Sequence, residues 1–540
     1  MSGLDEERWD DQADVIVVGF GAAGASTALE ASQQGASVLA LDRFHGGGST
    51  ATSGGVIYAG GGTPLQLQAG CPDSPDEMFN YLRQETGGVV LDETLRRFCD
   101  ESPRMIAWLE QAGVLFDGTL CPFKTSYPKD GYYLYYSGNE NCPPYRDHAK
   151  SAPRGHRPKG KGLSGQALFR ALESAAQRQV IRVRAQTEVR GLIQAADGRV
   201  IGVEGRTLSN PLARRIHAAL SRLSVTWSTY DLAFHGREMN ALLSLIMAAF
   251  SKPYRARARK GVILCAGGFA FNRAMVVQRN PAFKSCIPLG TFGDDGAGIA
   301  LGESVGGATA RLDRMTAWRF FVPPEALLKG VLLDGRGGRL CNEELYGAKQ
   351  GDYIVAAGGV AWLVFDRVTY QEAVRQIGRQ CAPFQRLVMI PTLYLLRKKA
   401  STYRSLAKKI GLPPGALEDT MGAYNSMARQ GASDPLGKNP QRCVPQDRPP
   451  FYALDDSIKA RMGIPTASLT LGGLVVDEQQ GSVLGKDRLP IEGLYAAGRN
   501  ALGLCSNGYF ASGISLADCV FSGRRAGYHA AIGSPGNGSK

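Results

Sequence analysis

The segment Gly19-Phe20-Gly21-Ala22-Ala23-Gly24 limits the fold more than any other stretch of the sequence. It is a GxGxxG pattern that follows the β-branched run 14–18 and opens a stretch of helical composition. In such a turn the first glycine permits a tight bend, the second lets the backbone approach a pyrophosphate, and the third lets helix pack on strand. A second apolar run ends at Asp42, where a carboxylate binds a ribose hydroxyl. The pattern predicts a βαβ unit that binds a dinucleotide.

Length and glycine content indicate a fold of several parts around an extended ligand. The chain has 540 residues, of which 68 are glycine. That length is too great for one simple core, and the glycine share is nearly double the usual value of roughly 7%. Such a surplus suits a backbone that approaches a long ligand in several places.

The formal net charge of +13 is concentrated in one segment. Between Arg206 and Lys260 there are ten Lys or Arg against two acidic residues, Asp231 and Glu238, so this stretch carries 10 − 2 = +8. A nucleic-acid binder would be more evenly basic, and no zinc-finger or RNP-like pattern accompanies the segment. We therefore expect no nucleic-acid partner.

Cysteine spacing and hydropathy bear on metal binding and location. The eleven cysteines include no CxxC pair and no spacing with histidine that suits zinc, so we expect reduced thiols and no metal. The stretch 1–14 is acidic and lacks the apolar region of a signal peptide. The longest apolar run, 241–250, is far shorter than the roughly 20 residues of a membrane span. The prediction is a cytoplasmic protein.

Three further glycine-rich strings carry a resemblance to a known superfamily. Gly472-Gly473 with residues 493–499 resembles the second flavin-binding stretch of the fumarate reductase/ketosteroid dehydrogenase flavoproteins, and Gly293-Asp294-Asp295-Gly296 resembles their GDG turn. Gly267-Gly268 matches their strand-to-turn glycines. The resemblance implies FAD as the cofactor. His45 is the only histidine near the glycine-rich loop, so we expect FAD to be bound without a covalent link.

The resemblance also implies which residues bind FAD. They lie in the first turn and the acid that follows it, in the loop 46–55, in the turns near 267 and 295, and in two C-terminal segments. The expected contacts are Gly19, Gly21, Ala22, Ala23, Gly24, Asp42, Arg43, Gly48, Ser49, Thr50, Ser53, Gly54, Gly55, Ala266, Gly267, Asp295, Gly296, Ala497, Gly498, Arg499, Gly513, Ser515 and Leu516.

Longer strings resemble one branch, the 3-ketosteroid Δ4-(5α)-dehydrogenases. They are residues 54–66, 136–141, 152–156, 342–346, 509–516 and 523–527. The resemblance implies oxidation of a 3-keto-5α-steroid to the 4-ene-3-one, with hydride transfer to flavin N5 and reoxidation by a quinone or another acceptor. Tyr346, Tyr509 and Ser512 match the active-site residues of the branch and would share proton abstraction and ketone polarisation, in roles that the sequence leaves open.

One departure from the branch concerns the string around Tyr509. The branch reads Gly-Tyr-Ala-Ser-Gly, whereas this chain has Gly508-Tyr509-Phe510-Ala511-Ser512-Gly513, with one extra residue. Either Tyr509 keeps its place through a bulge, or Phe510 takes that place and another residue supplies the hydroxyl.

Rival activities on the same scaffold remain open. A 3-ketosteroid Δ1-dehydrogenase would need only a different ring-A bond beneath N5. A fumarate-reductase-like enzyme is disfavoured, because the string 338–343 has the GxRxxNE pattern but lacks the arginine that should follow it as proton donor. A sterol-binding flavoprotein without turnover is the rival from another class.

The predicted architecture is α/β, with a Rossmann-like FAD-binding domain and an inserted α+β catalytic cap domain. The FAD-binding domain is discontinuous, residues 1–312 and 456–540, and the cap is 313–455. Residues 206–259 are predicted to be a basic amphipathic insert, with Leu212, Ile216 and Leu223 at helical spacing. The insert could contact a membrane surface at the inner face of the cell membrane, form an oligomer interface or fold over the protein as a flap.

Overall fold

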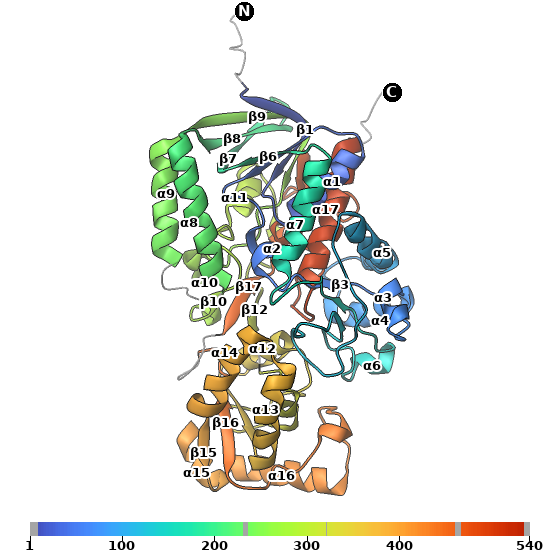
Figure 1. Ribbon diagram of the computed structural model, residues 1–540, viewed down its shortest axis with the longest axis vertical. Helices are drawn as coiled ribbons and strands as arrows, with labels where there is room; N and C mark the ends of the chain where they lie inside the picture. Colours follow the sequence, from blue (N-terminus) through green and yellow to red (C-terminus); the bar gives the residue numbers. More distant parts are fainter. Residues whose placement is uncertain (1–8, 230–235, 320, 460–465, 534–540) are drawn as a thin grey trace, which may run out of the picture.

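The computed structural model describes residues 9–229, 236–319, 321–459 and 466–533. It has two lobes stacked along one axis, an upper lobe built on a large sheet and a lower lobe with a smaller sheet (Figure 1). Residues 1–8 of the acidic stretch 1–14 lie outside the described residues. No helix among the described residues is long and apolar enough to cross a bilayer.

The upper lobe is organised around the buried strand β1 (Asp11–Val18). It pairs in parallel with β2 (Val38–Asp42) on one side and with β9 (Ser251–Leu264) on the other, with Val17 opposite Ala40 and Ile263. The parallel array continues with β20 (Pro490–Ala496) beyond β9 and β6 (Arg182–Ala185) beyond β2, and β19 (Ser482–Leu484) forms the antiparallel edge. The predicted α/β class and discontinuous Rossmann-like sheet are confirmed.

Helices α1 (Ala22–Gln33), α7 (Gly165–Arg178) and α17 (Ile514–Ile532) lie along the parallel strands (Figure 1). The N-terminal and C-terminal helices touch backbone to backbone, because a Cβ on Gly527 would stand 2.4 Å from the carbonyl oxygen of Thr27. The remaining upper-lobe elements are α2 (Gly48–Thr52), α3 (Pro64–Gln68), α4 (Pro75–Thr86), α5 (Asp92–Gln111), α6 (Tyr145–His148), α10 (Arg273–Arg279), α11 (Ala297–Ser304), β3 (Ile57–Tyr58), β4 (Leu134–Tyr135) and β5 (Gly155–His156).

The lower lobe contains a four-stranded antiparallel sheet of its own, in the order β13-β14-β16-β15. Two short strands, β12 (Met315–Trp318) and β17 (Ala467–Thr470), pair with each other between the lobes. The lower-lobe elements are β13 (Val331–Asp334), β14 (Ala361–Phe365), β15 (Lys398–Ala400), β16 (Phe451–Asp455), α12 (Gly347–Ala356), α13 (Arg367–Gln380), α14 (Pro383–Pro391), the π-helical turn η3 (Thr392–Leu396), α15 (Tyr403–Ile410) and α16 (Ala416–Gln430).

The predicted insert 206–259 contains a helical hairpin, but the predicted bounds are too wide at both ends. Strand β8 (Val200–Leu208) pairs with β7 (Thr187–Gln194) and runs to the hairpin, and β9 begins immediately after it at Ser251. The hairpin is α8 (Pro211–Thr229) and α9 (Gly236–Phe250). The basic run 252–260 belongs to β9, where buried Tyr254, Ala256 and Ala258 alternate with the basic side chains. That period of two is a strand signal, which the charge count obscured.

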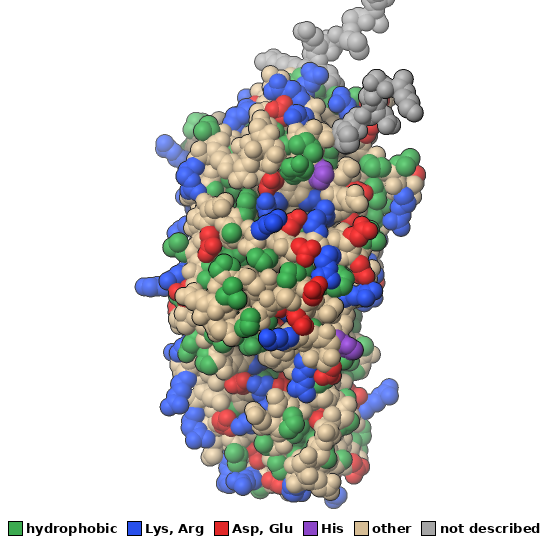
Figure 2. Space-filling view, turned by 90° about the vertical axis from the view of Figure 1, so that its right-hand side faces the viewer, with side chains coloured by type: hydrophobic (Ala, Val, Ile, Leu, Met, Phe, Trp, Pro, Cys, Tyr) green, Lys and Arg blue, Asp and Glu red, His purple; other side chains and the backbone are tan. Residues whose placement is uncertain are grey.

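One face of the molecule carries mixed charge. On the face drawn in Figure 2, acidic and basic side chains lie side by side with scattered apolar groups. The net charge of +13 is therefore not collected on this face.

Candidate active site

A cavity of about 1350 Å³ runs from the GxGxxG turn to the junction of the two lobes. It exceeds the roughly 300–1,000 Å³ of ordinary small-molecule pockets. Its wall includes Gly19 and Asp42 at one end, Tyr509 and Ser512 at the other, and Leu454 from the lower lobe. The space is sufficient for an extended cofactor together with a second molecule.

The GxGxxG turn is as tight as its spacing predicts. Gly19 has φ of +95°, and a Cβ on Gly24 would lie 1.9 Å from the carbonyl oxygen of Gly19. Glycine at position 24 therefore lets α1 pack on β1, and this residue is not part of the cavity wall. Asp42 lines the cavity and also braces the turn, since its carboxylate accepts hydrogen bonds from the backbone N–H of Phe20 (2.9 Å) and Phe44 (2.8 Å).

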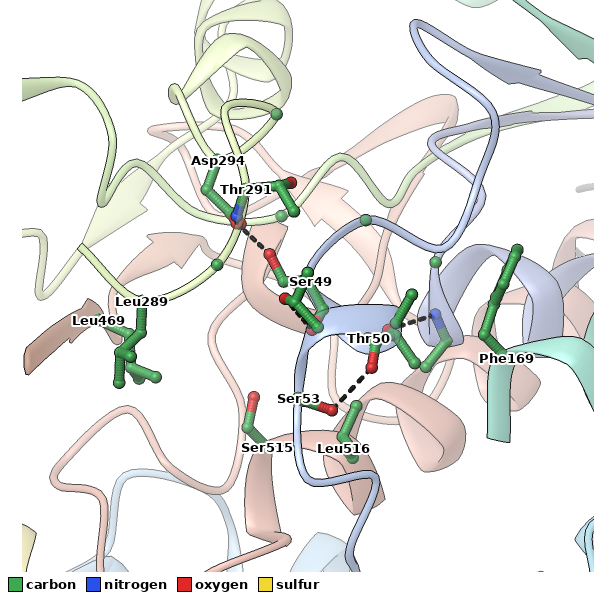
Figure 3. A pocket seen from close by; sticks show the side chains of 18 of the residues that line it. Ser49, Thr50, Ser53, Phe169, Leu289, Thr291, Asp294, Leu469, Ser515 and Leu516 are labelled. Carbon is green, nitrogen blue, oxygen red and sulfur yellow. Dashed lines mark hydrogen bonds between the residues drawn. The ribbon is translucent and has the colours of Figure 1, made fainter. Parts of the chain in front are cut away.

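The glycine-rich loop forms the short helix α2 against the same turn. Thr50 Oγ1 accepts a hydrogen bond from the N–H of Ala22 (2.9 Å), and Ser53 Oγ donates to the carbonyl of Thr50 (2.7 Å) (Figure 3). Ser49 donates to Asp294, so the loop is tied to the turn at 293–296 as well. These bonds hold the loop's hydroxyls and glycines along the cavity wall.

The acidic turn contributes a residue that the sequence prediction missed. Asp294 accepts hydrogen bonds from the backbone N–H of Gly268 (3.1 Å) and Thr291 (3.1 Å) and forms an ion pair with Arg499. The neighbouring Asp295, which was predicted, pairs with Arg43 at 2.7 Å. The string Gly-Asp-Asp-Gly pointed to the turn but did not distinguish its two carboxylates.

Most of the predicted cofactor-binding residues line the cavity. Four do not, and each has another position: Gly24 packs α1 on β1, Gly296 caps α11 with φ of +86°, and Ala497 and Gly498 are buried behind the wall. The predicted residues on the wall are Gly19, Gly21, Ala22, Ala23, Asp42, Arg43, Gly48, Ser49, Thr50, Ser53, Gly54, Gly55, Ala266, Gly267, Asp295, Arg499, Gly513, Ser515 and Leu516.

An aromatic cluster closes the inner end of the cavity. The ring centroids of Tyr346 and Tyr509 are 6.2 Å apart, and Trp318 lies 5.4 Å from the first and 5.3 Å from the second. Tyr509 and Ser512 are on the cavity wall, whereas Tyr346 is behind it and 3% exposed. The structure thus brings together the three predicted catalytic side chains, and it adds Trp318, which no motif indicated.

The hydroxyl groups of this cluster are buried. Burial raises the pKa of Tyr346, Tyr509 and Tyr135. The Ser512 hydroxyl, which favours the ionised forms of Tyr135 and Tyr346, opposes that shift without reversing it. The Tyr346 hydroxyl is buried and has no hydrogen-bond partner within the part of the chain that the structure describes. Tyr135 belongs to an aromatic stretch without a motif, so the sequence analysis did not select it.

The extra residue at Phe510 is absorbed by the core. Phe510 is 1% exposed and packs edge-on against Tyr58, with ring centroids 6.5 Å apart. Tyr509 consequently keeps its side chain on the cavity wall. Of the two arrangements that the sequence left open, the structure has the first.

A buried polar network fixes the backbone at Tyr346. Its N–H donates to Asn139 Oδ1 (2.6 Å), and Asn139 Nδ2 donates to Glu85 Oε1 (2.6 Å). Burial raises the pKa of Glu85 to about 7, although Lys349 lies 3.7 Å away. The network orients the segment that carries Tyr346.

Comparison with known proteins gives a match to the family described as "FAD binding domain", over residues 14–516. The chain belongs to this FAD-binding family. Its cofactor is FAD. The 3-oxo-5-alpha-steroid 4-dehydrogenase of Comamonas testosteroni is 38% identical over 511 residues, which cover 92% of this chain and 94% of that protein. The 3-oxosteroid 1-dehydrogenase of Mycolicibacterium smegmatis is 29% identical over 545 residues, which cover 90% and 91%.

A solved structure agrees with the resemblance to the Δ4-(5α) branch. The 3-ketosteroid-delta4-(5alpha)-dehydrogenase from Rhodococcus jostii RHA1, in complex with 4-androstene-3,17-dione, superimposes with a TM-score of 0.81 at 31% identity. The superposition covers 98% of each chain. The predicted similarity is therefore confirmed in sequence and in structure.

The cavity fits FAD on its own geometry. The turn at Gly19 and Gly21 presents bare backbone to the cavity, and the start of α1 lies directly behind it, as pyrophosphate binding requires. The wall between that turn and the aromatic cluster is made of small residues and hydroxyls such as Ser49, Thr50 and Ser515. No group of three or more potential metal ligands occurs within the described ranges.

The helical hairpin covers the nucleotide end of the FAD cavity. His217 is fully buried and stacks on Phe44, with ring centroids 6.0 Å apart and planes at 18°. Ser221 Oγ lies 2.8 Å from His45 Nδ1. Ser221, with its neighbours Arg222 and Ser224, forms part of the cavity wall. One face of α8 therefore acts as the flap that the sequence analysis kept as an alternative.

Proposed function

We propose that the protein oxidises 3-keto-5α-steroids to the corresponding 4-ene-3-ones. The observation that carries this proposal is the hydroxyl cluster at the inner end of the cavity, with Tyr509 and Ser512 on the wall and Tyr346 behind them. Dehydrogenation beside a ketone requires a base for the α-proton and a donor for the developing enolate. Bound FAD supplies the acceptor for the hydride from the β-carbon. Similarity to the two Δ4-dehydrogenases supports the choice of substrate.

The positions of the hydroxyls suggest which residue acts in proton abstraction and which donates a hydrogen bond to the ketone. Ser512 lies on the cavity wall beside the buried Tyr346 and Tyr135, and its hydroxyl favours the ionised form of both. In the proposed step one of these tyrosines is the base in its ionised form: Ser512 accepts the α-proton while its own proton passes to the tyrosinate oxygen. Tyr509 lies on the wall, and its raised pKa keeps the hydroxyl protonated at neutral pH. A protonated hydroxyl suits a donor to the ketone oxygen, which is the enolate-stabilising part.

Anaerobic bleaching of the flavin tests the proposal. A saturated 3-keto-5α-steroid should bleach the bound FAD, whereas succinate and a 4-ene-3-one should not. Bleaching by the 4-ene-3-one would indicate Δ1 chemistry, which the 29% identity to a 3-oxosteroid 1-dehydrogenase makes the second candidate. Product analysis by mass spectrometry and NMR would then identify the new double bond. If none of the three compounds bleaches the flavin, the steroid proposal is wrong.

A fumarate-reductase-like reaction receives no support from the arginines near the site. Arg339, in the GxRxxNE string, is held by Glu343 (2.7 Å) and Asp434 and is not on the cavity wall. Arg319 is on the wall, but its guanidinium donates to the backbone carbonyls of Asp455 (2.6 Å) and Ser457 (3.0 Å). Neither arrangement provides a proton donor for a dicarboxylate.

We also propose a quinone or similar acceptor for flavin reoxidation, and a peripheral location at the inner face of the cell membrane. Part of the predicted insert supports membrane contact, because the outer faces of α8 and α9 expose large apolar side chains: Leu212, Ile216, Leu223, Leu242, Leu245 and Phe250. Such a face can enter the lipid interface. Co-sedimentation with vesicles of wild type and of a Leu212→Gln/Leu245→Gln variant tests this contact.

A further inference from the structure

Helix α14 and the turn η3 form one wall of the cavity and are at the same time part of the outer surface. Leu387 lines the cavity and is 72% exposed, so the cavity opens beside it. Gln385 Nε2 donates to the carbonyl of Tyr127 (3.2 Å), and the Tyr127 hydroxyl donates to the carbonyl of Gly54 (3.2 Å). Helix α14 therefore lies near the glycine-rich loop, and in Figure 1 it is at the top of the lower lobe, below the hairpin α8–α9.

The outward side of this element is apolar. Ile390 is 47% exposed, Tyr394 48% and Leu395 76%. Together with Leu387 they form a continuous crest along α14 and η3, which we call the apolar crest. Crests of large exposed apolar side chains in folded proteins mark contact with a partner or a membrane.

The apolar crest lies within a strongly basic stretch of the chain. Residues 373–417 contain no Asp or Glu and nine Lys or Arg, namely Arg375, Arg379, Arg386, Arg397, Lys398, Lys399, Arg404, Lys408 and Lys409. Arg404 forms an ion pair with Glu418 outside the stretch (3.0 Å). Arg386 and Arg397 donate hydrogen bonds to backbone carbonyls, which are neutral and do not offset the positive charge. Exposed apolar side chains within a segment rich in positive charge are the composition of elements that bind anionic lipid interfaces.

We propose that the apolar crest docks on an anionic lipid leaflet, with the cavity opening against the acyl chains. A steroid would then pass from the leaflet into the cavity along Leu387 without crossing water. The identity of that lipid-borne substrate rests on the proposed function, but the docking does not. The inner face of the hairpin plays no part in this contact, because it covers the nucleotide end of the FAD cavity.

Vesicle co-sedimentation of the FAD-loaded full chain tests the docking. Wild type should sediment with phosphatidylcholine/phosphatidylglycerol vesicles, less with pure phosphatidylcholine, and less again at high salt. Ile390→Gln/Leu395→Gln removes two crest side chains that do not line the cavity, and it should lower the partition coefficient about tenfold or more. The matched control is Leu489→Gln, an exposed leucine (64%) elsewhere, which should sediment like wild type.

Two results would overturn the docking. One is unchanged sedimentation of the crest variant, including the case in which only Leu212→Gln/Leu245→Gln loses binding and the contact lies on the hairpin. The other is a crest variant that binds vesicles normally but changes the oligomeric state by gel filtration, because the crest would then cover a second copy of the chain.

Steroid delivery separates this inference from the proposed function. With a 3-keto-5α-steroid loaded into vesicles, the crest variant should turn over several-fold more slowly than wild type. With the steroid supplied from cyclodextrin, the two should be equal. Equal rates from both sources overturn the entry route. Absence of turnover from either source, with crest-dependent sedimentation intact, would instead refute the steroid proposal and leave the docking in place.

Discussion

In the proposed reaction the chemistry depends on a few buried hydroxyls, and their surroundings indicate a role more clearly than the residue type does. Among the described residues the buried hydroxyl of Tyr346 has no partner at hydrogen-bonding distance, and the side chain lies behind the cavity wall next to Ser512 and Tyr509. An unsatisfied buried polar group costs free energy, so its presence beside a cofactor cavity indicates a functional role. If this side chain served only to pack the core, a phenylalanine would fill the same space without the buried hydroxyl.

Tyr346→Phe should therefore reduce activity without harming the fold. We expect kcat for the 3-keto-5α-steroid to fall about 10²- to 10⁴-fold, the usual worth of one proton-transfer group. The flavin absorption spectrum and melting temperature should remain those of wild type, since no hydrogen bond to this hydroxyl is lost. Stopped-flow flavin reduction measures the effect, with exposed Tyr528→Phe as the control. Unchanged kcat would remove Tyr346 from the mechanism.

Asp456 gives a prediction for pH dependence. It is 5% exposed, its nearest cation is Arg319 (Nε at 3.6 Å), and burial raises its pKa from 3.8 to about 7. A carboxyl whose folded pKa is raised stabilises the fold below its unfolded pKa and loses that contribution as pH rises through the folded value. The loss should occur between about pH 4 and pH 7.

Asp456→Asn should remove this dependence. Relative to wild type, the variant should gain about 1–3 kcal/mol of unfolding free energy at pH 8 and little near pH 4. Urea unfolding at both pH values measures the difference. Glu492→Gln, at an exposed position of β20, should show no such change between the two pH values. A variant that is less stable than wild type at pH 8 would show that the pair with Arg319 outweighs burial.

At the scale of elements, the hairpin α8–α9 has two faces of different character. Its inner face, with His217 and Ser221, closes the nucleotide end of the FAD cavity, whereas its outer face is apolar and exposed. Cofactor retention and surface contact are therefore separable by mutation.

His217→Ala/Ser221→Ala should loosen FAD. Loss of the stack on Phe44 and of the bond to His45 should speed FAD dissociation about tenfold, as expected for roughly 1–2 kcal/mol of lost contacts. The rise of flavin fluorescence after dilution reports the rate directly, without turnover. Leu212→Gln/Leu245→Gln, on the outer face, is the matched variant and should dissociate at the wild-type rate. If FAD dissociated from both variants at the wild-type rate, the hairpin would not contribute to holding the cofactor.

Elements with a local signature were predictable, and those defined by tertiary contact were not. The GxGxxG turn with its strands and helix carries a spacing signal, and the structure has these elements where the sequence predicts them. Tyr346, Tyr509 and Ser512 carry motif signals and lie close together, and their catalytic role stays a prediction. The strand 252–260 was concealed because basic residues masked its period of two. Trp318, Tyr135 and the apolar crest lie in no motif, and their positions relative to the cavity follow only from tertiary contacts of β12, β4 and α14.

At the scale of the whole molecule, the FAD cavity lies at the junction of the lobes. Its wall takes residues from the sheet of the upper lobe and from β16 and α14 of the lower lobe. The lobes are also joined by the pairing of β12 with β17 and by one apolar core that extends from β1 to β14 and β16. Because the cavity wall takes residues from both lobes, we expect bound FAD to add to these contacts in holding the lobes in one arrangement.

FAD should raise the free energy of unfolding by an amount that grows with the logarithm of the free FAD concentration, and the protein without FAD should be less stable. A ligand that binds only the folded state adds RT ln(1 + [L]/Kd), about 2.7 kcal/mol at 100 times Kd. Calorimetry of the apoprotein with increasing FAD should show a rising melting temperature and, without FAD, a broader transition in which the lobes unfold less cooperatively. Riboflavin, which lacks the pyrophosphate and adenosine that the GxGxxG turn and the hairpin contact, is the control and should raise the melting temperature much less. If riboflavin stabilised the chain as well as FAD does, the nucleotide end of the cavity would contribute little to binding, and the cover formed by α8 would need another explanation.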